Sequence, residues 1–566
     1  MRGREVFDHI PEQACRELEA IVGPENMTTD PVIREAYTGR GMDREIFWYQ
    51  GVCRTPAAII QAKSTEEVVR IVKTCNRFGI PYTPMVTYGM AMCGPAFRDD
   101  IVLIDLKRMK KMWIDVKNMY AVVEPGVIYA QLHGEILKRD LTAVIPGGGG
   151  QVSVLANTFI LGVGLLNYRI EFVSHRRLNG VEWVSPEGEV YRMGSLAAGD
   201  DSWYWRDGLG PDATGLLHGI VSWAGGMGIV TKISTKLYPF QPQKLEPDGL
   251  GPNTWLNMPP RLRWYNIGFP TEESCRKAMG EMERARIGAV INRVPAYWRD
   301  IAKARGDVAF RNEFWELWNQ KTQKDVAENR VLRVLLIGRA CQEQLEYEER
   351  VLTDIVNETG GILRRARQAD EAVFLAANTR GMWKATGVFG ECDGGIEVPR
   401  CIDKAREIYI NKLLNYEHKS DFLDQKGESP WYISFGLGRV YYTELHGWPD
   451  CAKVDPDDPQ FEPGRVDRIL RWRVNEAEKI IIQTGVEAFF PGQIQPMRLT
   501  SPACQNHHVW IDRFKKEFDP KGLASPGQPY IPDRMYQELF PDAITEEIRE
   551  EVKKAEAGPW LGNPES

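Results

Sequence analysis

The sequence lacks several patterns that would assign a protein class at once. None of its 10 cysteines forms a Cys-x-x-Cys pair, which argues against an iron–sulfur cluster or a structural zinc site in this chain. No stretch approaches the roughly 20 uninterrupted apolar residues that a membrane-spanning helix needs. There is no internal repeat and no low-complexity tract, so a fibrous repeat is excluded.

A long basic run is also missing. The 71 basic residues against 78 acidic ones give a formal net charge of -7, so we do not expect a nucleic-acid partner. The first residues, MRGREVFDHIPEQ, are charged and lack the apolar segment of a secretory signal. The scattered cysteines fit a reducing compartment in which most thiols are buried. We therefore expect a cytoplasmic protein without a membrane span.

The length and composition are those of a multi-domain globular protein. With 566 residues, of which 43% are hydrophobic and 26% charged, the chain has room for two to four domains. Residues 1–50 read as a helical lead-in and 51–240 as a glycine-rich domain built from strands and helices. Residues 241–500 read as an α+β domain with longer amphipathic helices and an antiparallel sheet, and 501–566 as loops and short helices.

The first domain opens with a β-α-β unit. Ser64 is the expected N-cap of its helix, with Glu67 completing a capping box, and Gly79 ends the helix. Other elements follow from hydrophobic periodicity. We expect helices over 11–22, 272–286 and 342–359, and strands over 57–62, 80–85, 101–106, 120–123, 180–184, 228–237, 330–337 and 431–442.

Four glycine-dense loops lie between the strands of the first domain. Glycine is needed where the backbone takes positive φ or approaches a ligand closely. Four such loops within about 80 residues indicate a cofactor groove lined by backbone, although four ordinary turns in a β-rich domain are the alternative. The loops are 146–150, 162–164, 208–211 and 225–228.

A set of ordered motifs carries a family resemblance. Residues 119–127, MYAVVEPGV, resemble the "AVVEPGV" segment of FAD-linked oxidases of the vanillyl-alcohol oxidase and p-cresol methylhydroxylase type. Further segments resemble this family in its order and spacing, strongly over 51–240, weakly over 241–500 and well over 500–530. They are 55–94, 147–164, 180–190, 208–216, 227–239 and 518–527.

The resemblance implies FAD as the cofactor and an α+β fold. A PCMH-type FAD-binding domain would be joined to an α+β cap domain with an antiparallel sheet, and residues 501–566 would return to the FAD domain. Backbone N–H groups of residues 87–94 could hold the pyrophosphate of FAD without a basic side chain. The expected cofactor-binding residues are Pro84, Val86, Thr87, Tyr88, Gly89, Met90, Ala91, Pro125, Gly126, Gly148, Gly149, Ser153, Asn157, Gly162, Gly228, Ile229 and Val230.

Covalent attachment of FAD is not expected. Family members often tether FAD through a His or Tyr of the second domain, but the corresponding segment here contains no His. Tyr441, Tyr442 and, less well placed, Tyr432 are the alternatives, and Cys93 lies in the loop used by other covalent types. Packing of these tyrosines in the core is the competing interpretation, so we expect non-covalent FAD.

Several residues are candidates for catalysis. Phenol-oxidising relatives hold the substrate phenolate with Tyr and Arg, and Arg498 is the best match, although a surface ion pair fits it equally well. Tyr88 resembles the tyrosine of the family's loop. The acidic residue that lies by the flavin N5 in this family falls within 165–175 here, where Asn167, Glu171 or His175 could take its place.

The remaining catalytic candidates lie nearer the C-terminus. Either histidine of the pair His507 and His508 could act as a base or contact substrate, and Tyr442 adds a phenol from the cap. A metal-binding role for the pair has weak support, and placement at a helix end explains it more simply. No metal site is predicted.

The resemblance implies an FAD-dependent oxidoreductase that passes hydride from a small organic substrate to flavin N5. Para-substituted phenols, namely 4-alkylphenols or 4-hydroxybenzyl alcohols, are the first expectation. A D-2-hydroxy acid such as lactate or glycolate is the alternative, as is a flavin-bearing subunit that relays electrons. The electron acceptor is open between oxygen, a cytochrome, an electron-transfer flavoprotein and an iron–sulfur subunit. A homo-oligomer is expected.

Overall fold

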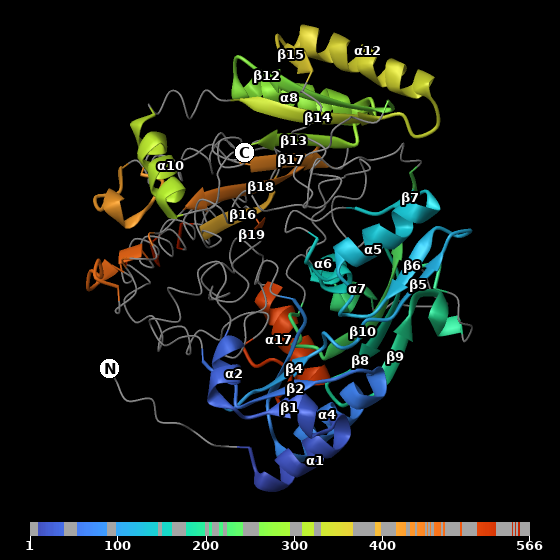
Figure 1. The fold of residues 1–566 in the computed structure, drawn as a ribbon, viewed down its shortest axis with the longest axis vertical. Coiled ribbons are helices and arrows are strands. Elements are labelled where there is room, and N and C mark those ends of the chain that lie inside the picture. The colour runs from blue at the N-terminus through green and yellow to red at the C-terminus, as the bar shows by residue number, and fades with distance from the viewer. Residues whose placement is uncertain are drawn as a thin grey trace.

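The structure is a computed structural model of residues 1–566 (Figure 1). The part of the chain that it describes comprises residues 10–38, 54–87, 98–144, 150–160, 177–198, 203–206, 214–218, 223–240, 260–294, 308–321, 330–365, 391–397, 415–425, 431–435, 438–447, 450, 453, 458–465, 468–469, 487–488, 507–527, 546, 549–550 and 553–554.

A four-stranded sheet forms the first layer. Its order is β1-β2-β4-β3, in which β2, β4 and β3 run parallel and β1 pairs with β2 antiparallel. Helices α1 and α4 pack together on it, and their apolar faces form one core. The bounds are α1 Glu12–Val22, β1 Met27–Thr28, α2 Pro31–Ala36, β2 Ala58–Gln61, α4 Thr65–Phe78, β3 Tyr82–Met85 and β4 Val102–Asp105.

The signals that predicted α4 act as expected, with one change. The Ser64 hydroxyl accepts from the backbone N–H of Glu67 at 3.3 Å, and Gly79 ends the helix with φ +67°. The Glu67 carboxylate, however, accepts from the N–H of Lys63 at 2.9 Å. In the predicted capping box Glu67 would accept from the N–H of Ser64. It accepts instead from the N–H of Lys63, one residue earlier in the chain.

A five-stranded antiparallel sheet forms the second layer, in the order β5-β6-β10-β8-β9. Glu182 of β8 is buried and ties this sheet to α4, because it accepts from Thr65 at 2.8 Å and from Thr231 at 3.0 Å, and pairs with Lys232. The bounds are β5 Met112–Asp115, β6 Tyr120–Val123, α5 Tyr129–Ile136, α6 Val154–Ile160, β8 Leu178–Val184, β9 Val190–Met193, α7 Thr214–Leu217 and β10 Ile229–Lys236, with β7 Leu141–Thr142 pairing β11 Tyr238–Pro239.

The cap contains an eight-stranded sheet within the described residues, and the expectation of an antiparallel cap sheet is confirmed. Its order is β15-β12-β14-β13-β17-β18-β16-β19, with every neighbouring pair antiparallel. Helices α8 and α12 bury their apolar faces against one side of it. The bounds are β12 Leu262–Gly268, α8 Glu272–Arg284, β13 Val290–Val294, α10 Val308–Gln320, β14 Val331–Ile337, α12 Gln342–Glu358, β15 Ile362–Arg365, β16 Glu391–Glu397, β17 Trp431–Phe435, β18 Val440–Gly447 and β19 Glu487–Ala488.

The single strand expected over 431–442 is wrong, because the chain forms a hairpin there. β17 and β18 pair antiparallel, with Phe435 opposite Val440 and Trp431 opposite Glu444. Gly438 lies between the two strands at φ +74°, a conformation that side-chain-bearing residues rarely adopt. The apolar pattern of both strands is continuous in sequence, so periodicity alone did not reveal the reversal.

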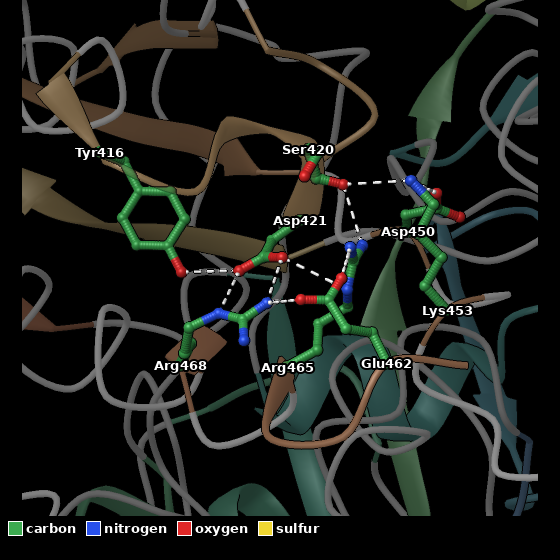
Figure 2. A network of polar contacts seen from close by, with 8 residues as sticks. All are labelled: Tyr416, Ser420, Asp421, Asp450, Lys453, Glu462, Arg465 and Arg468. Atoms are coloured by element: carbon green, nitrogen blue, oxygen red, sulfur yellow. Dashed lines mark hydrogen bonds and ion pairs between the residues drawn. The ribbon is translucent and has the colours of Figure 1, made fainter. Parts of the chain in front are cut away.

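A network of charges centred on a buried carboxylate joins the chain before the cap hairpin to the chain after it (Figure 2). Asp421 is fully buried, accepts from the Tyr416 hydroxyl at 2.8 Å and pairs with Arg465 at 3.3 Å and Arg468 at 3.0 Å. Arg465 and Arg468 also bind Glu462 and lower the pKa of that carboxyl to about 2. The network therefore joins residues 416–421 to 462–468 through compensated charges.

Candidate functional site

The candidate site begins where the parallel strand β3 ends. Thr87 follows this strand closely, and its hydroxyl oxygen accepts from the backbone N–H of Ser153 at 3.0 Å. The Ser153 hydroxyl donates to the Pro125 carbonyl at 2.6 Å and accepts from the Ala156 N–H at 3.2 Å, which caps α6. Three segments that the sequence assigned to cofactor binding therefore meet at the buried Ser153.

The turn that contains Pro125 is drawn close to a neighbouring loop. The N–H of Gly126 donates to the Met109 carbonyl at 2.7 Å, and a Cβ at Gly126 would lie 2.6 Å from the carbonyl oxygens of Lys107 and Met109. Only glycine fits this approach without a backbone shift. On the other side of the turn, Asn157 of α6 donates to the Tyr129 hydroxyl at 3.2 Å.

A second glycine turn packs against β3 from the opposite direction. Gly225 and Gly228 have φ of +87° and +96°, and both lie in very close contact with neighbouring atoms. A Cβ at Gly225 would lie 2.5 Å from Pro84 Cδ and Ser525 Oγ, and one at Gly228 would lie 2.2 Å from the Val184 carbonyl oxygen. Pro84 is thus covered by the 225–228 turn, and Gly228 leads directly into β10.

The C-terminal segment contributes to this region through its contacts with β3. Tyr82 of β3 donates its N–H to the Leu523 carbonyl at 2.9 Å, and its own carbonyl accepts from the Ser525 N–H at 2.7 Å. The segment thus adds to the edge of the first sheet, in parallel with β3. Figure 1 shows α17 (His507–Phe518) lying beside the N-terminal sheet although it comes from the other end of the chain.

The expected cofactor-binding residues divide into three groups. Pro84, Thr87, Pro125, Gly126 and Ser153 lie in the two contact regions described above, and Asn157 and Gly228 border them. The side chain of Ile229 is buried in the first core and that of Val230 packs on the second, while Val86 packs against the first. Outside the described residues lie Tyr88, Gly89, Met90, Ala91, Gly148, Gly149 and Gly162.

The catalytic candidates are placed only in part. Arg498, Glu171 and Tyr88 lie outside the described residues, as do Cys93, Asn167 and His175. His507 is the first residue of α17 and His508 the second, so placement at a helix end is confirmed for this pair. Tyr442 lies in β18 opposite Ile433 and Ile396, and its side chain is outside the described part.

Tyr432 and Tyr441 point to the side of the cap sheet that α8 covers. The Tyr432 hydroxyl donates to Glu272 of α8, and the Tyr441 hydroxyl donates to the Arg276 carbonyl at 3.4 Å. Their rings contact each other edge to face, with centroids 5.8 Å apart. Burial raises the pKa of Tyr441 to about 12 and that of Tyr432 well above its usual value. Core packing, the competing interpretation, is therefore confirmed for both.

The residues present fit FAD. The polar groups at the Ser153 junction are neutral hydroxyls and backbone amides that bond one another, so they fix the neighbouring segments without placing a negative charge beside a pyrophosphate. Gly126 and Gly228 allow backbone approaches that no other residue permits at these positions. No group of three or more His, Cys, Asp or Glu side chains that could hold a metal ion occurs in the ranges that the structure describes.

Sequence reasoning missed two residues that organise this region, Lys515 and Asp519. Lys515 of α17 contacts the carbonyls of Gly226 and Ala524 and pairs with Asp519 at 2.8 Å. The only local signal is an i,i+4 charge pair, which is usually a solvated surface feature. Its role depends on a carbonyl 289 residues away, which the sequence does not indicate.

Comparison with known proteins agrees with these observations. A family model described as "FAD binding domain" matches residues 56–194. The flavoprotein subunit of 4-cresol dehydrogenase (hydroxylating) from Pseudomonas putida is 29% identical over 238 residues, which are 41% of this chain and 43% of that protein. A glycolate oxidase subunit of Bacillus subtilis is 26% identical over 232 residues, 41% of this chain and 46% of that protein. The chain thus matches less than half the length of these relatives.

The likeness of fold extends further than the likeness of sequence. The crystal structure of p-cresol methylhydroxylase with substrate bound matches with a TM-score of 0.67 at 19% identity, covering 92% of this chain and 97% of that one. Among the helices that the structure describes, none has the length and apolar character to cross a membrane. Residues 56–194 thus match an FAD-binding domain, and the fold of the chain is similar to that of p-cresol methylhydroxylase.

Proposed function

We propose that this protein is an FAD-dependent oxidoreductase that oxidises a para-substituted phenol, such as a 4-alkylphenol or a 4-hydroxybenzyl alcohol. The observation that carries the proposal is the match of fold to p-cresol methylhydroxylase, which includes the cap as well as the FAD-binding region. The similarity of sequence to a 4-cresol dehydrogenase subunit supports the same substrate class. Bound FAD supplies the hydride acceptor, its N5 atom.

The protein's own residues take distinct parts in this proposal. Thr87, Ser153 and the glycine turns shape the FAD site through neutral contacts and close backbone approaches. The FAD in this proposal is dissociable, which the commitment of Tyr432 and Tyr441 to the cap core supports. Arg498 stabilises the phenolate and the negative charge that develops on reduction. Tyr88, Glu171, Tyr442 and the pair His507 and His508 are the proposed substrate contacts or proton acceptors.

A D-2-hydroxy acid is the second candidate substrate, because a glycolate oxidase subunit is among the related sequences. The two substrate classes differ in the group that must be recognised, a phenolate or a carboxylate next to the reacting carbon. A transfer of electrons to a partner is a further proposal, supported by the description of the 4-cresol dehydrogenase relative as a flavoprotein subunit.

The first test is the visible spectrum of the purified protein before and after acid precipitation. Flavin released into the supernatant is the expected result for dissociable FAD, whereas colour that stays in the pellet contradicts it.

The substrate test uses the FAD-loaded protein, which is mixed without oxygen with 4-hydroxybenzyl alcohol, benzyl alcohol or D-lactate. Bleaching by 4-hydroxybenzyl alcohol but not by benzyl alcohol, which lacks only the para hydroxyl, is expected. Bleaching by D-lactate alone overturns the phenol proposal in favour of the hydroxy acid.

The role of Arg498 has its own test. The Arg498→Met variant should bleach with 4-hydroxybenzyl alcohol roughly 100-fold more slowly, because the developing negative charge loses its partner. The flavin content per chain should stay that of the unchanged protein. Arg513→Met, at an exposed position of α17, is the matched control and should keep the original rate. Equal rates in both variants remove Arg498 from the proposed mechanism.

A further inference from the structure

Lys515 is a mostly buried lysine whose ammonium group contacts three acceptors. Its side chain is only 19% exposed, and its ammonium group contacts the carbonyl oxygens of Gly226 and Ala524 and the carboxylate of Asp519. These acceptors come from two chain segments that are nearly 300 residues apart in sequence. A lone ammonium group that is largely withdrawn from water requires such compensation.

Asp519, the partner of Lys515, fixes the C-terminal turn from within. It is 5% exposed, and its two carboxylate oxygens accept from the N–H groups of Leu523 at 3.1 Å and Ala524 at 3.0 Å. The turn in this shape presents Leu523 and Ser525 to Tyr82 of β3. The ion pair and the turn therefore determine how the C-terminal segment joins the edge of the first sheet.

The same ammonium group holds the 225–228 turn in place. This turn reads Gly-Gly-Met-Gly and is closed by backbone hydrogen bonds from Gly226 to Trp223 and from Gly228 to Gly225. The Met227 carbonyl accepts from the Trp183 indole N–H at 2.7 Å, and the Gly226 carbonyl accepts from Lys515. Gly225 lies in close contact with Pro84 and Ser525. The Lys515 ammonium group thus connects the 519–525 turn to the 225–228 turn, and both turns contact β3, the strand that precedes Thr87.

We infer that Lys515 is a positioning residue for FAD, which locks the 225–228 turn and the 519–525 turn against β3 so that the cofactor groove keeps its shape. Lys515 acts through these turns and needs no contact with FAD. The inference rests on FAD as the cofactor and is independent of the substrate. An alternative is that Lys515 contributes to global stability alone.

Titration of FAD into apoprotein, followed by flavin fluorescence, tests the inference. Lys515→Met keeps the length of the side chain but removes its charge and donors, and should raise the Kd of FAD at least tenfold. The neighbouring Lys516→Met, at an exposed position, is the matched control and should stay within twofold of the unchanged protein. Unchanged affinity in Lys515→Met, or equal loss in both variants, overturns the inference.

Two further measurements separate positioning from general stability. Loss of Lys515 leaves the buried Asp519 without its counter-charge, so the melting temperature of apo Lys515→Met, measured by circular dichroism, should fall. Asp421→Asn, which breaks the buried ion pair with Arg465 in the cap, should lower the melting temperature at least as much and keep its affinity for FAD. Loss of affinity in Asp421→Asn as well assigns the effect to stability and overturns the inference.

Hydrogen exchange on the unchanged protein keeps the inference testable if Lys515→Met does not fold. Adding FAD should slow amide hydrogen exchange both in peptides that cover 222–230 and in peptides that cover 519–527, because the Lys515 ammonium group contacts both segments. Slowing in one without the other contradicts the inference. A protein that binds no FAD at all contradicts the cofactor assignment instead, and a protein that binds FAD but oxidises no phenol leaves the inference intact.

Discussion

The Ser153 hydroxyl donates a hydrogen bond to the Pro125 carbonyl at 2.6 Å, and this contact joins the start of α6 to the Pro-Gly turn after β6. The backbone N–H of Ser153 also donates to the Thr87 hydroxyl oxygen. A single serine thus links the three segments of the candidate FAD site that the structure describes.

Ser153→Ala should weaken FAD binding more than it weakens the fold. Loss of the α6 cap costs about 1 kcal/mol of unfolding free energy, whereas loss of the Pro125 contact frees the turn and should raise the Kd of FAD about tenfold, which corresponds to about 1.4 kcal/mol. Ser64→Ala loses a comparable cap on α4 and serves as the control. The two variants should destabilise the apoprotein similarly in urea, and only Ser153→Ala should change the Kd. An equal Kd of FAD for Ser153→Ala and Ser64→Ala would contradict the proposal that Ser153 organises the FAD site.

Gly228→Ala should be strongly disruptive. The position has φ +96°, and a Cβ would lie 2.2 Å from the Val184 carbonyl oxygen, so the backbone must move. The strain should cost about 2 kcal/mol of unfolding free energy or more, together with most of the bound flavin. Gly215→Ala in α7 has open space at its Cβ and should be neutral or slightly stabilising. Flavin content per chain and urea midpoints distinguish Gly228→Ala from Gly215→Ala. A Gly228→Ala protein with unchanged flavin content and urea midpoint would contradict the prediction.

His133 should make the protein sensitive to mild acid. Burial lowers the pKa of this imidazole to about 4, against a smaller opposing effect of the Val144 backbone. Between this pKa and the ordinary value of 6.5, the unfolded chain binds the proton more readily, so stability falls as the pH falls through that interval. The full loss is about 3 kcal/mol, reached near pH 4 and below.

His133→Leu should remove that part of the pH dependence. Urea midpoints at pH 6.5, 5.5 and 4.5 give the slope for each protein, and the slope of His133→Leu should be shallower. His418→Leu, at an exposed position, is the control and should follow the unchanged protein. Parallel slopes for all three proteins would show that folding does not lower the pKa of His133.

The buried carboxylate of Asp421 should be indispensable to its network (Figure 2). Asp421→Asn leaves Arg465, which is 2% exposed, without its buried counter-charge and should cost about 3 kcal/mol or more. Asp450→Asn removes a partly exposed pair with Lys453 and should cost less than about 1 kcal/mol. Chemical denaturation of both variants measures the difference. A cost for Asp450→Asn that equals that of Asp421→Asn is the opposing outcome.

Local signals in the sequence located much of the first domain. Ser64 and Gly79 mark the ends of α4, and the strands around them were expected within a few residues. Such signals act over one turn or one strand, so they survive without knowledge of the rest of the chain. The hairpin of β17 and β18 was missed for the same reason, because its apolar pattern continues across the reversal at Gly438.

The sequence by itself indicated the cofactor class, through ordered motifs that resemble those of FAD-linked oxidases. It also indicated an antiparallel cap, through strands that alternate with longer amphipathic helices after residue 240. Tertiary structure alone decided which side of the cap sheet Tyr432 and Tyr441 occupy, and that Lys515 holds the turn at Gly226. These outcomes depend on contacts between segments far apart in the chain, whose free energy comes from shared burial and appears only when the segments pack.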